Sequence, residues 1–497
     1  MKQSYLILTS LIALTLGSCK KDFLNTEPTQ FTTPERLGAD ARQDPKLLNG
    51  NIAGLYTTMF TPGVGGTTGH DDFGQKGIDI YTDMLQSDMV LGALNYGWYS
   101  NVARYNASPD FTRNEVYIPF RYYYRQIFGA NTIIDILGGN TAVPAEVGNK
   151  YTMGQAKAMR AYSYFYLSQL YGKEYGSGTD KLIPIYTSAK QLNQPKATTK
   201  EVFDLMVKDL NEAITLLTGF TRSTKDQVDI NVARGLLAYV LSARGTQADL
   251  TEVVRLTQLI MNSYAKTPGA QLFFNGTNAT TAGFNNVSTP SWMWGVDLTL
   301  AQGINLISWW GQVDLFTYSY AWAGDGKIID RGLYNQIGSD DIRRSQFRTP
   351  TQSYAGYPIG KFWAPARTIA GQRFVETDNL YMRSDEFYLL NAEAKARLNQ
   401  SSEAITTLKS FLADRKTNVS YIDALSGEAL LNEIYLQTRI ELWGEGKAYL
   451  AMKRLKRPVV RGSNHLFEAD ATIPFNDAKL TFVIPQAEVL NNPNLDK

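Results

Sequence analysis

Paired helical segments recur along this chain, and they constrain its fold more than any other feature of the sequence. Residues 154–171 are apolar over most of a helical circumference, which predicts a buried helix, and Thr198 with Glu201 predicts the capping box that opens the next one. Further helices are predicted at residues 231–244, 249–264, 384–398, 401–415 and 427–443. Helix-turn-helix units of about 34 residues with small side chains at the crossings are typical of tetratricopeptide repeats. Because one unit cannot bury its apolar face alone, we expect the pairs to stack.

Two long segments interrupt this helical pattern. Residues 60–120 and 265–383 lack a sustained helical period and are rich in Gly, Thr, Asn and Tyr. Loops of this length without regular structure are uncommon unless they have a function. We therefore expect a helical scaffold on one side and an irregular, aromatic-rich face on the other. The second segment contains six of the eight tryptophans: Trp292, Trp294, Trp309, Trp310, Trp322 and Trp363.

The N-terminus carries the pattern of a bacterial lipoprotein signal. Lys2 precedes an apolar run over residues 5–16, which is too short to span a bilayer. Leu16-Gly17-Ser18-Cys19 fits a lipobox, in which the sulfur is acylated, and Cys19 is the only cysteine, so it has no disulfide partner. The alternative is a plain secretory signal with an incidental cysteine. The sequence predicts a signal peptide at 1–18, lipid attachment at Cys19, a tether at 19–34 and a single body at 35–497.

Charge and composition exclude several classes of partner and of chemistry. The chain has 49 Lys and Arg residues and 47 Asp and Glu residues, so its net charge is only +2. Such a chain has no strong positive electrostatic field that would attract nucleic acid. Charged residues make up 19%, below the usual value of about 25%, and such a surface favours neutral, hydroxyl-rich ligands. Only His70 and His465 could act as a histidine base, Gly-x-Ser-x-Gly is absent, and neither histidine has a metal-ligand spacing. We expect no catalytic residue, cofactor or metal, although two acids from distant loops would leave no sequence signature of a glycosidase.

Several motifs that resemble reactive sites are interpreted as structural. Glu441 and Glu445 lie four residues apart on a predicted helix, where surface pairing or capping of neighbouring loops is the preferred interpretation. His70-Asp71-Asp72 could bind a cation through oxygens, but we expect a solvated polar loop. The glycine-rich residues 61–69 lack the spacing of a dinucleotide fingerprint and are interpreted as a mobile loop.

Two loop segments combine aromatic planes with polar side chains, as a sugar-binding site requires. Sugars present C–H faces, against which aromatic rings stack, and hydroxyl edges, which polar side chains hydrogen-bond. A large share of these aromatic residues is expected to be core packing instead. Tyr318, Tyr320 and Trp322 also alternate with the period of a strand, which would place them on one side of it. The candidate ligand-binding residues are Tyr96, Trp98, Tyr99, Asn101, Trp309, Trp310, Tyr318, Tyr320 and Trp322.

Seven motifs along nearly the whole chain carry a resemblance to a known family. They are residues 19–28 (from Cys19-Lys20-Lys21-Asp22-Phe23-Leu24 to Pro28), 124–131, 158–165, 386–394, 439–446, 484–488 and 492–495. In this order they resemble the motifs of the SusD/RagB lipoproteins of the Bacteroidota outer membrane. In that family, the segment that corresponds to Ser87-Asp88 and Trp98 often contributes to the ligand face.

The resemblance implies a fold, a role and partners. The fold would be mostly α, with interrupted tetratricopeptide-repeat pairs at about 121–264 and 384–456 and a loop-rich ligand-binding region at about 60–120 and 265–383. The role would be that of a lipid-anchored outer-membrane protein, facing the cell exterior, that captures an oligosaccharide or polysaccharide without cleaving it. Its partner would be a SusC-like TonB-dependent barrel, which imports the ligand. Oligopeptide binding, as in the RagB branch, is the alternative for the same role; a surface endo-glycosidase and a protein-docking scaffold are alternatives of other classes.

Overall fold

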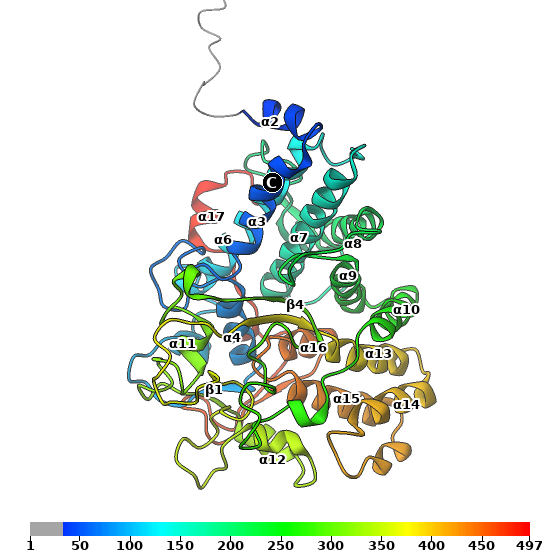
Figure 1. The fold of residues 1–497 in the computed structure, drawn as a ribbon. Coiled ribbons are helices and arrows are strands. Elements are labelled where there is room, and N and C mark those ends of the chain that lie inside the picture. The colour runs from blue at the N-terminus through cyan, green and yellow to red at the C-terminus, as the bar shows by residue number, and fades with distance from the viewer. Residues whose placement is uncertain (1–32) are drawn as a thin grey trace, which may run out of the picture.

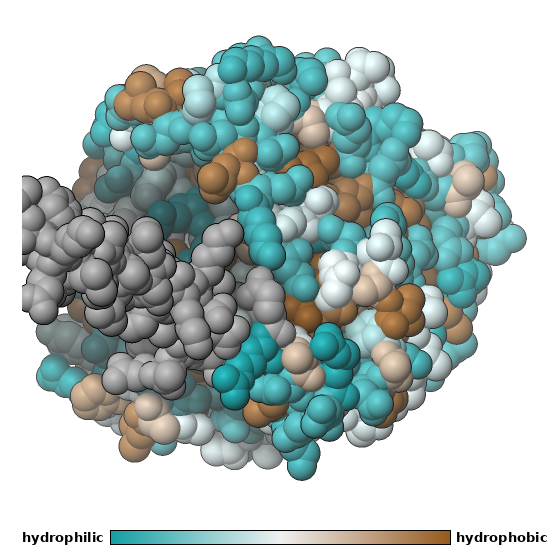
Figure 2. Space-filling model, turned by 90° about the horizontal axis from the view of Figure 1, so that it is seen from above, coloured by the Kyte–Doolittle hydropathy of each residue, from teal (hydrophilic) through white to brown (hydrophobic). Residues whose placement is uncertain are grey.

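The computed structural model describes residues 33–497. The predicted signal peptide, the predicted lipid-attachment residue Cys19 and most of the predicted tether lie outside the described residues. No helix within 33–497 combines the length and the hydropathy that a membrane span requires. Seen from the end that carries α2 (Pro34–Ala41), the surface is mainly hydrophilic, with separate hydrophobic patches (Figure 2).

A curved array of helices forms one side of the molecule (Figure 1). From α6 to α10 each helix packs on its neighbours in sequence, and α13 then packs directly on α10 although the second loop segment separates them in the chain. This arrangement confirms the predicted, mostly α fold of interrupted helical pairs. The helices of the array are α6 (Asn114–Ile136), α7 (Val147–Tyr171), α8 (Thr199–Leu216), α9 (Ile230–Arg244), α10 (Gln247–Ser263), α13 (Asp385–Arg397), α14 (Ser401–Leu412), α15 (Gly427–Glu441) and α16 (Ala448–Arg454).

Local sequence signals set the ends of these helices. The Thr198 side chain accepts the Glu201 N–H and the Glu201 side chain accepts the Thr198 N–H, so the predicted capping box opens α8. Thr246 and Asp249 form a second box at the start of α10. Gly245 ends α9 with a φ of 72°, a conformation that glycine adopts without strain.

Short antiparallel ladders and short helices organise the rest of the described chain. The pairs are β1 (Met89–Leu91) with β5 (Lys327–Ile329), β2 (Lys181–Pro184) with β3 (Lys196–Thr198), β4 (Trp292–Val296) with β6 (Asn379–Arg383), and β7 (Val459–Val460) with β8 (Thr472–Ile473). The β4–β6 ladder joins the first half of the second loop segment to its C-terminal end, so residues 297–378 loop out from the ladder. The remaining helices are α3 (Asn49–Thr57), α4 (Gln75–Leu85), α5 (Ser100–Ala103), α11 (Trp309–Val313), α12 (Arg331–Gln336) and α17 (Gln486–Asn491).

The segment 60–120, predicted to lack helices, contains a fully buried one. Every residue of α4 is buried, although one side of the helix is apolar and the opposite side is polar. Asp79 accepts hydrogen bonds from Lys76 Nζ (2.7 Å) and Gln75 Nε2 (2.9 Å). The polar side is stable in the interior because these groups pair with each other. The apolar side spans only 11 residues, which is short of the sustained helical period on which the prediction relied.

Most tryptophans of the second loop segment lie in the protein core. Trp322 is the exception, with 42% of its surface exposed. The prediction of an aromatic-rich face is therefore wrong for the other five, because their rings fill the space that the long loops would otherwise leave empty. Those five, none more than 2% exposed, are Trp292, Trp294, Trp309, Trp310 and Trp363.

Glu441 and Glu445 lie in a buried network of charges, so the predicted surface pairing is wrong. Glu441 accepts hydrogen bonds from Arg343 (3.1 Å), Arg383 (3.0 Å) and Arg415 (3.3 Å). Glu445 pairs with Arg383 and with Lys361, both at 2.8 Å. All of these side chains are at most 3% exposed. The network joins the end of α15 to β6 and to the loop-rich region.

A second buried pair joins the N-terminal and C-terminal parts of the described body. Asp88, which follows α4, accepts a hydrogen bond from Arg439 of α15 (2.6 Å), across 351 positions of sequence. The Trp443 indole N–H donates to the Asp88 carbonyl (2.7 Å), and α4 packs on α16. The N-terminal and C-terminal thirds of the body therefore share one core.

Candidate functional site

Four rings from distant parts of the chain form an aromatic cluster in the loop-rich region. His70 and Trp98 stack with their centroids 5.0 Å apart and their planes within 1°. Tyr320 meets both edge-on, at 5.8 and 6.3 Å, and its hydroxyl hydrogen-bonds to Nδ1 of His70 (2.5 Å). Tyr96 contacts Tyr320 at 5.0 Å. The structure thus brings together three predicted site residues and adds His70, which was not among the predicted ligand-binding residues.

Asp325 holds this cluster together. Its buried carboxylate accepts the backbone N–H groups of Asn95 (2.5 Å), Tyr96 (2.8 Å) and Gly97 (2.8 Å). These bonds tie the loop that carries Tyr96 and Trp98 to the turn that carries Tyr320. Sequence reasoning missed Asp325 because a single aspartate in a glycine-containing turn carries no signal of its remote partners.

A cavity of about 970 Å³ adjoins the cluster. Tyr99 is 2% exposed, and its hydroxyl has no hydrogen-bond partner among the described residues. An unpaired buried hydroxyl is uncommon, and this one lies beneath the cavity surface, closed to solvent. The wall contains four predicted site residues, Tyr96, Trp98, Tyr99 and Asn101, and also Gly66, Thr67, Thr68, Gly69, Asp71, Gly97, Thr112, Arg113, Asn114 and Glu115.

The glycine-rich loop forms one wall of this cavity and is fixed by Asp72. The Asp72 carboxylate accepts the N–H of Gly65 (2.7 Å) and the N–H of Thr67 (2.9 Å). Gly66 has a φ of 86°, which strains any larger residue, and a Cβ there would lie 2.4 Å from Arg121 Cδ and would displace that side chain. The prediction of a solvated polar loop at residues 70–72 is wrong for Asp71 and Asp72, which are 7% and 0% exposed, because their carboxylates have partners inside the protein.

Burial changes the titration of the groups around the cavity. It raises the pKa of Asp71 to about 6, although the Tyr81 hydroxyl donates a hydrogen bond to this carboxylate (2.7 Å). Burial lowers the pKa of His70, which favours the neutral imidazole in the stack with Trp98. Within residues 33–497, no group of three or more His, Cys, Asp or Glu side chains is arranged to hold a metal ion.

The other predicted site residues lie outside this cavity. Trp309 and Trp310 are at most 2% exposed and pack against Phe362, so their predicted contact with a ligand is wrong. They belong to α11, where Gln312 donates to the His70 carbonyl (2.7 Å) and so supports the cluster from behind.

Tyr318 and Trp322 form a separate ring pair. Their centroids lie 5.3 Å apart, and the Arg373 guanidinium lies 4.2 Å from the Tyr318 ring. Residues 318–324 form a bend and turns instead of a strand, so Tyr318, Tyr320 and Trp322 do not share one side as predicted. The turn points Tyr320 toward His70 and leaves Trp322 exposed.

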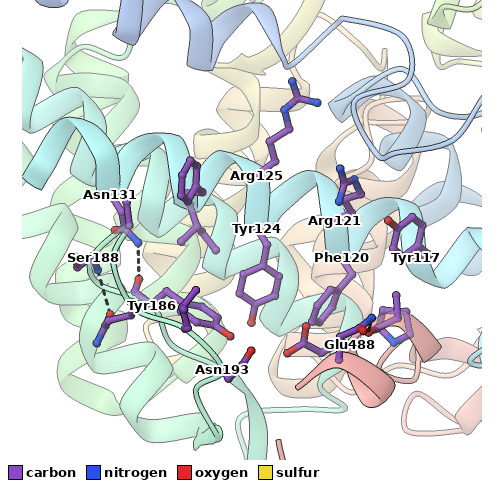
Figure 3. Close-up of a pocket in the computed structure, with 18 residues that line it drawn as sticks. Tyr117, Phe120, Arg121, Tyr124, Arg125, Asn131, Tyr186, Ser188, Asn193 and Glu488 are labelled. Atoms are coloured by element: carbon purple, nitrogen blue, oxygen red, sulfur yellow. Dashed lines mark hydrogen bonds between the residues drawn. The ribbon is translucent and has the colours of Figure 1, made fainter. Parts of the chain in front are cut away.

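A second cavity, of about 730 Å³, lies between α6, the loop at residues 186–193 and α17 (Figure 3). Phe120 and Tyr124 project from α6 into this space toward Glu488, while Arg121 and Arg125 project from the other side of the helix. The Tyr124 hydroxyl donates to the Pro184 carbonyl (2.7 Å), so it is already paired within the protein. None of the predicted site residues lines this cavity, and the aromatic cluster beside the larger cavity is the stronger candidate.

Comparison with known proteins gives matches over most of the chain. A family model described as starch-binding associating with outer membrane matches residues 74–233, and one described as SusD family matches residues 316–497. A SusD-like carbohydrate binding protein from Bacteroides vulgatus has a similar structure, with 23% identity, a TM-score of 0.72, and coverage of 92% of this chain and 97% of its own. A SusD superfamily protein from Bacteroides fragilis has 21% identity and a TM-score of 0.71, with coverage of 94% and 100%.

A curated relative supports the same assignment over a shorter region. A SusD-like protein of Formosa agariphila is 26% identical over 175 residues, which is 35% of this chain and 31% of that protein. The two family models together cover more than half of the chain, and they include both the loop of Trp98 and the turn of Tyr320. The chain therefore belongs to the SusD/RagB family.

Proposed function

We propose that this protein captures an oligosaccharide or polysaccharide at the cell surface and delivers it, without cleaving it, to a SusC-like TonB-dependent transporter. The observation that carries the proposal is the aromatic cluster of His70, Trp98, Tyr96 and Tyr320 beside the 970 Å³ cavity. Tyr96 is 62% exposed, so its ring is open to a sugar face. The proposal includes lipid attachment at Cys19 and exposure to the cell exterior. The description of the first family model and the carbohydrate-binding neighbour from Bacteroides vulgatus support it.

The polar wall of the cavity suits the hydroxyl edges of a sugar. The side chains of Asn101 and Thr68 lie on this wall and offer hydrogen-bonding groups to a ligand. Asn101 already donates to Glu115 Oε1 (2.7 Å), which leaves its amide oxygen to accept from a ligand hydroxyl. Stacking planes and directed hydrogen-bonding groups therefore lie around one space.

Affinity electrophoresis tests the binding step. The protein would be run through native gels that contain soluble starch, laminarin or galactomannan, and retention would be measured against polymer concentration. Trp98→Ala should weaken retention about 30-fold, since removing a central aromatic contact costs about 2 kcal/mol. Phe128→Ala is the matched control, because Phe128 is 59% exposed and does not line this cavity. Equal retention of wild type and Trp98→Ala would contradict the assigned site.

Two further measurements test the ligand class and the delivery step. Mass spectrometry of ligand that copurifies with the protein should find carbohydrate, and a peptide instead would favour the oligopeptide alternative. Coexpression with a SusC-like barrel should yield a complex that survives affinity purification on either partner. Loss of the barrel during purification under all detergents would count against delivery.

Glycoside hydrolysis is a second candidate, favoured by one observation. Asp71 and Glu115 both line the cavity, and the raised pKa of Asp71, about 6, is suited to a general acid. Reducing-end release from the same three polymers would support this candidate, provided that Asp71→Asn abolishes it. If no reducing ends are released, this second candidate is rejected and the protein binds glycans without cleaving them.

A further inference from the structure

Carboxylates dominate the charge of the cavity wall. Asp71 and Glu115 line it and are 7% and 8% exposed, so water does little to screen them. Asp72 lies directly behind the glycine-rich loop, and its buried carboxylate holds that loop in place. The negative charges of Asp71 and Asp72 both raise the pKa of the Tyr99 hydroxyl, which burial raises most.

The cations near the cavity do not balance these carboxylates. Among the described residues that line it, Arg113 is the only basic one, and its guanidinium pairs with Asp110 (2.9 Å). Lys327 lies behind the Tyr99 ring, where its ammonium donates to the backbone carbonyl of Asp325 (3.2 Å). It is fully buried and does not line the cavity.

Arg121 is a further cation close to the glycine-rich loop. Its side chain lies next to Gly66, but it lines the second cavity and not this one. Burial raises the pKa of Asp72, and the charge of Arg121 opposes that rise only in part. Five carboxylates lie in or near the cavity wall against three cations, which leaves an excess of negative charge. The carboxylates are Asp71, Asp72, Asp110, Glu115 and Asp325, and the cations are Arg113, Arg121 and Lys327.

We infer that this cavity takes uncharged glycans and rejects those that carry uronate or sulfate groups, and that Glu115 and Asp71 set this preference. The inference rests on the proposed function. An uncharged sugar donates its hydroxyl hydrogens to the two carboxylates, which accept strong hydrogen bonds. A uronate or sulfate in the same position brings a like charge into a poorly screened space and finds no free cation among the described residues of the wall.

Matched pairs of polymers test this preference, whichever neutral glycan the protein binds. Soluble starch, laminarin and galactomannan would each be compared with the same polymer after oxidation of its primary alcohols to carboxylates. The measurement is retention in native gels at pH 8, which lies well above the pKa of Asp71. The expected result is at least tenfold weaker retention of the oxidised form of any polymer that binds. The difference should shrink in 1 M salt, where the screening length is about 3 Å.

The variants Glu115→Gln and Asp71→Asn test whether these two carboxylates set the preference. The substitution Glu115→Gln keeps an oxygen that can accept from Asn101 and removes the charge. Each variant should raise the ratio of oxidised to neutral binding at least threefold, whereas the control Glu252→Gln, on the surface of α10, should not. Equal or tighter binding of an oxidised polymer by wild type would overturn the inference while leaving glycan binding intact. Failure to retain any of the six polymers would overturn the proposed function, and the inference with it.

Discussion

Replacing Glu441 by Gln tests the role of the buried charge network. The buried members of the network are four cations, Arg343, Arg383, Arg415 and Lys361, and four carboxylates, Asp341, Asp385, Glu441 and Glu445. Asp414, which is 38% exposed, also pairs with Arg415 (2.6 Å). Glu441 contacts three of the guanidiniums. The substitution keeps the shape of the side chain but leaves one positive charge uncompensated in the interior.

The expected cost follows from these contacts. Each contact at about 4 Å is worth about 4 kcal/mol at an effective dielectric constant of about 20, and burial of the ions cancels much of the sum. Breaking a buried pair by removing one partner costs about 3–5 kcal/mol, and we expect a loss of this size for Glu441→Gln. Glu428→Gln on the same helix is the control. The Glu428 side chain pairs with Arg457 but is 73% exposed, so this ion pair should contribute at most about 1 kcal/mol to stability.

Urea unfolding, followed by tryptophan fluorescence and by circular dichroism, measures how much free energy of unfolding the Glu441→Gln and Glu428→Gln variants lose.

The pH dependence of the stability gives an independent check. Burial alone would raise the pKa of Glu441, but Arg415, Arg383 and Arg343 outweigh it and hold the pKa well below its usual value. The stability that the ionised Glu441 contributes is therefore present above the usual carboxylate pKa and is lost as the pH falls below it. The acid limb of the stability curve should be shallower in Glu441→Gln, and equal losses in the two variants would refute the reasoning.

Three further outcomes are expected. Trp309→Ala should destabilise the protein by about 3–5 kcal/mol in urea, because its ring is buried, whereas Trp322→Ala should change stability by less than about 0.5 kcal/mol. Asp325→Asn should weaken glycan retention and speed hydrogen exchange at the three backbone amides that donate to it; unchanged exchange would contradict its role as the anchor of the loop. Asp71→Asn should stabilise the protein above pH 6 by at most about 3 kcal/mol, because the folded state holds the proton of Asp71 more tightly than the unfolded state between about pH 4 and 6. That gain should vanish at pH 4, as measured by urea unfolding at both pH values, and a constant gain would contradict the raised pKa.

The helices of the array could be predicted because their signals are local. The capping box of Thr198 and Glu201 lies within four residues, and apolar periodicity repeats within each helix. α4 was not predicted because its apolar side spans only 11 residues, within a segment that is rich in Gly, Thr, Asn and Tyr. Periodicity identifies the apolar side of such a helix, but it does not show that the polar side, where Gln75 and Lys76 pair with Asp79, is buried as well.

The binding residues were harder to predict because exposure depends on remote contacts. Trp98 and Trp309 are alike in the sequence, yet Phe362 covers Trp309 while His70 stacks on Trp98 and leaves it partly exposed. The partner of His70, Tyr320, lies 250 positions away. Composition identified the kind of side chain that a glycan site needs, but only the fold decides which rings face the ligand.

The contact between Asp88 and Arg439 has a consequence for how the protein folds. Closing a loop of 351 positions requires that α15 already exists, so the core around α4 stays incomplete until nearly all of the chain is present. A chain that leaves the ribosome or a translocation channel from its N-terminus would expose the apolar residues of α4 throughout that time. Folding should therefore depend on chaperones that hold the emerging N-terminal third. The ligand site, whose loops flank α4 and meet the remote turn of Tyr320, should be among the last parts to form.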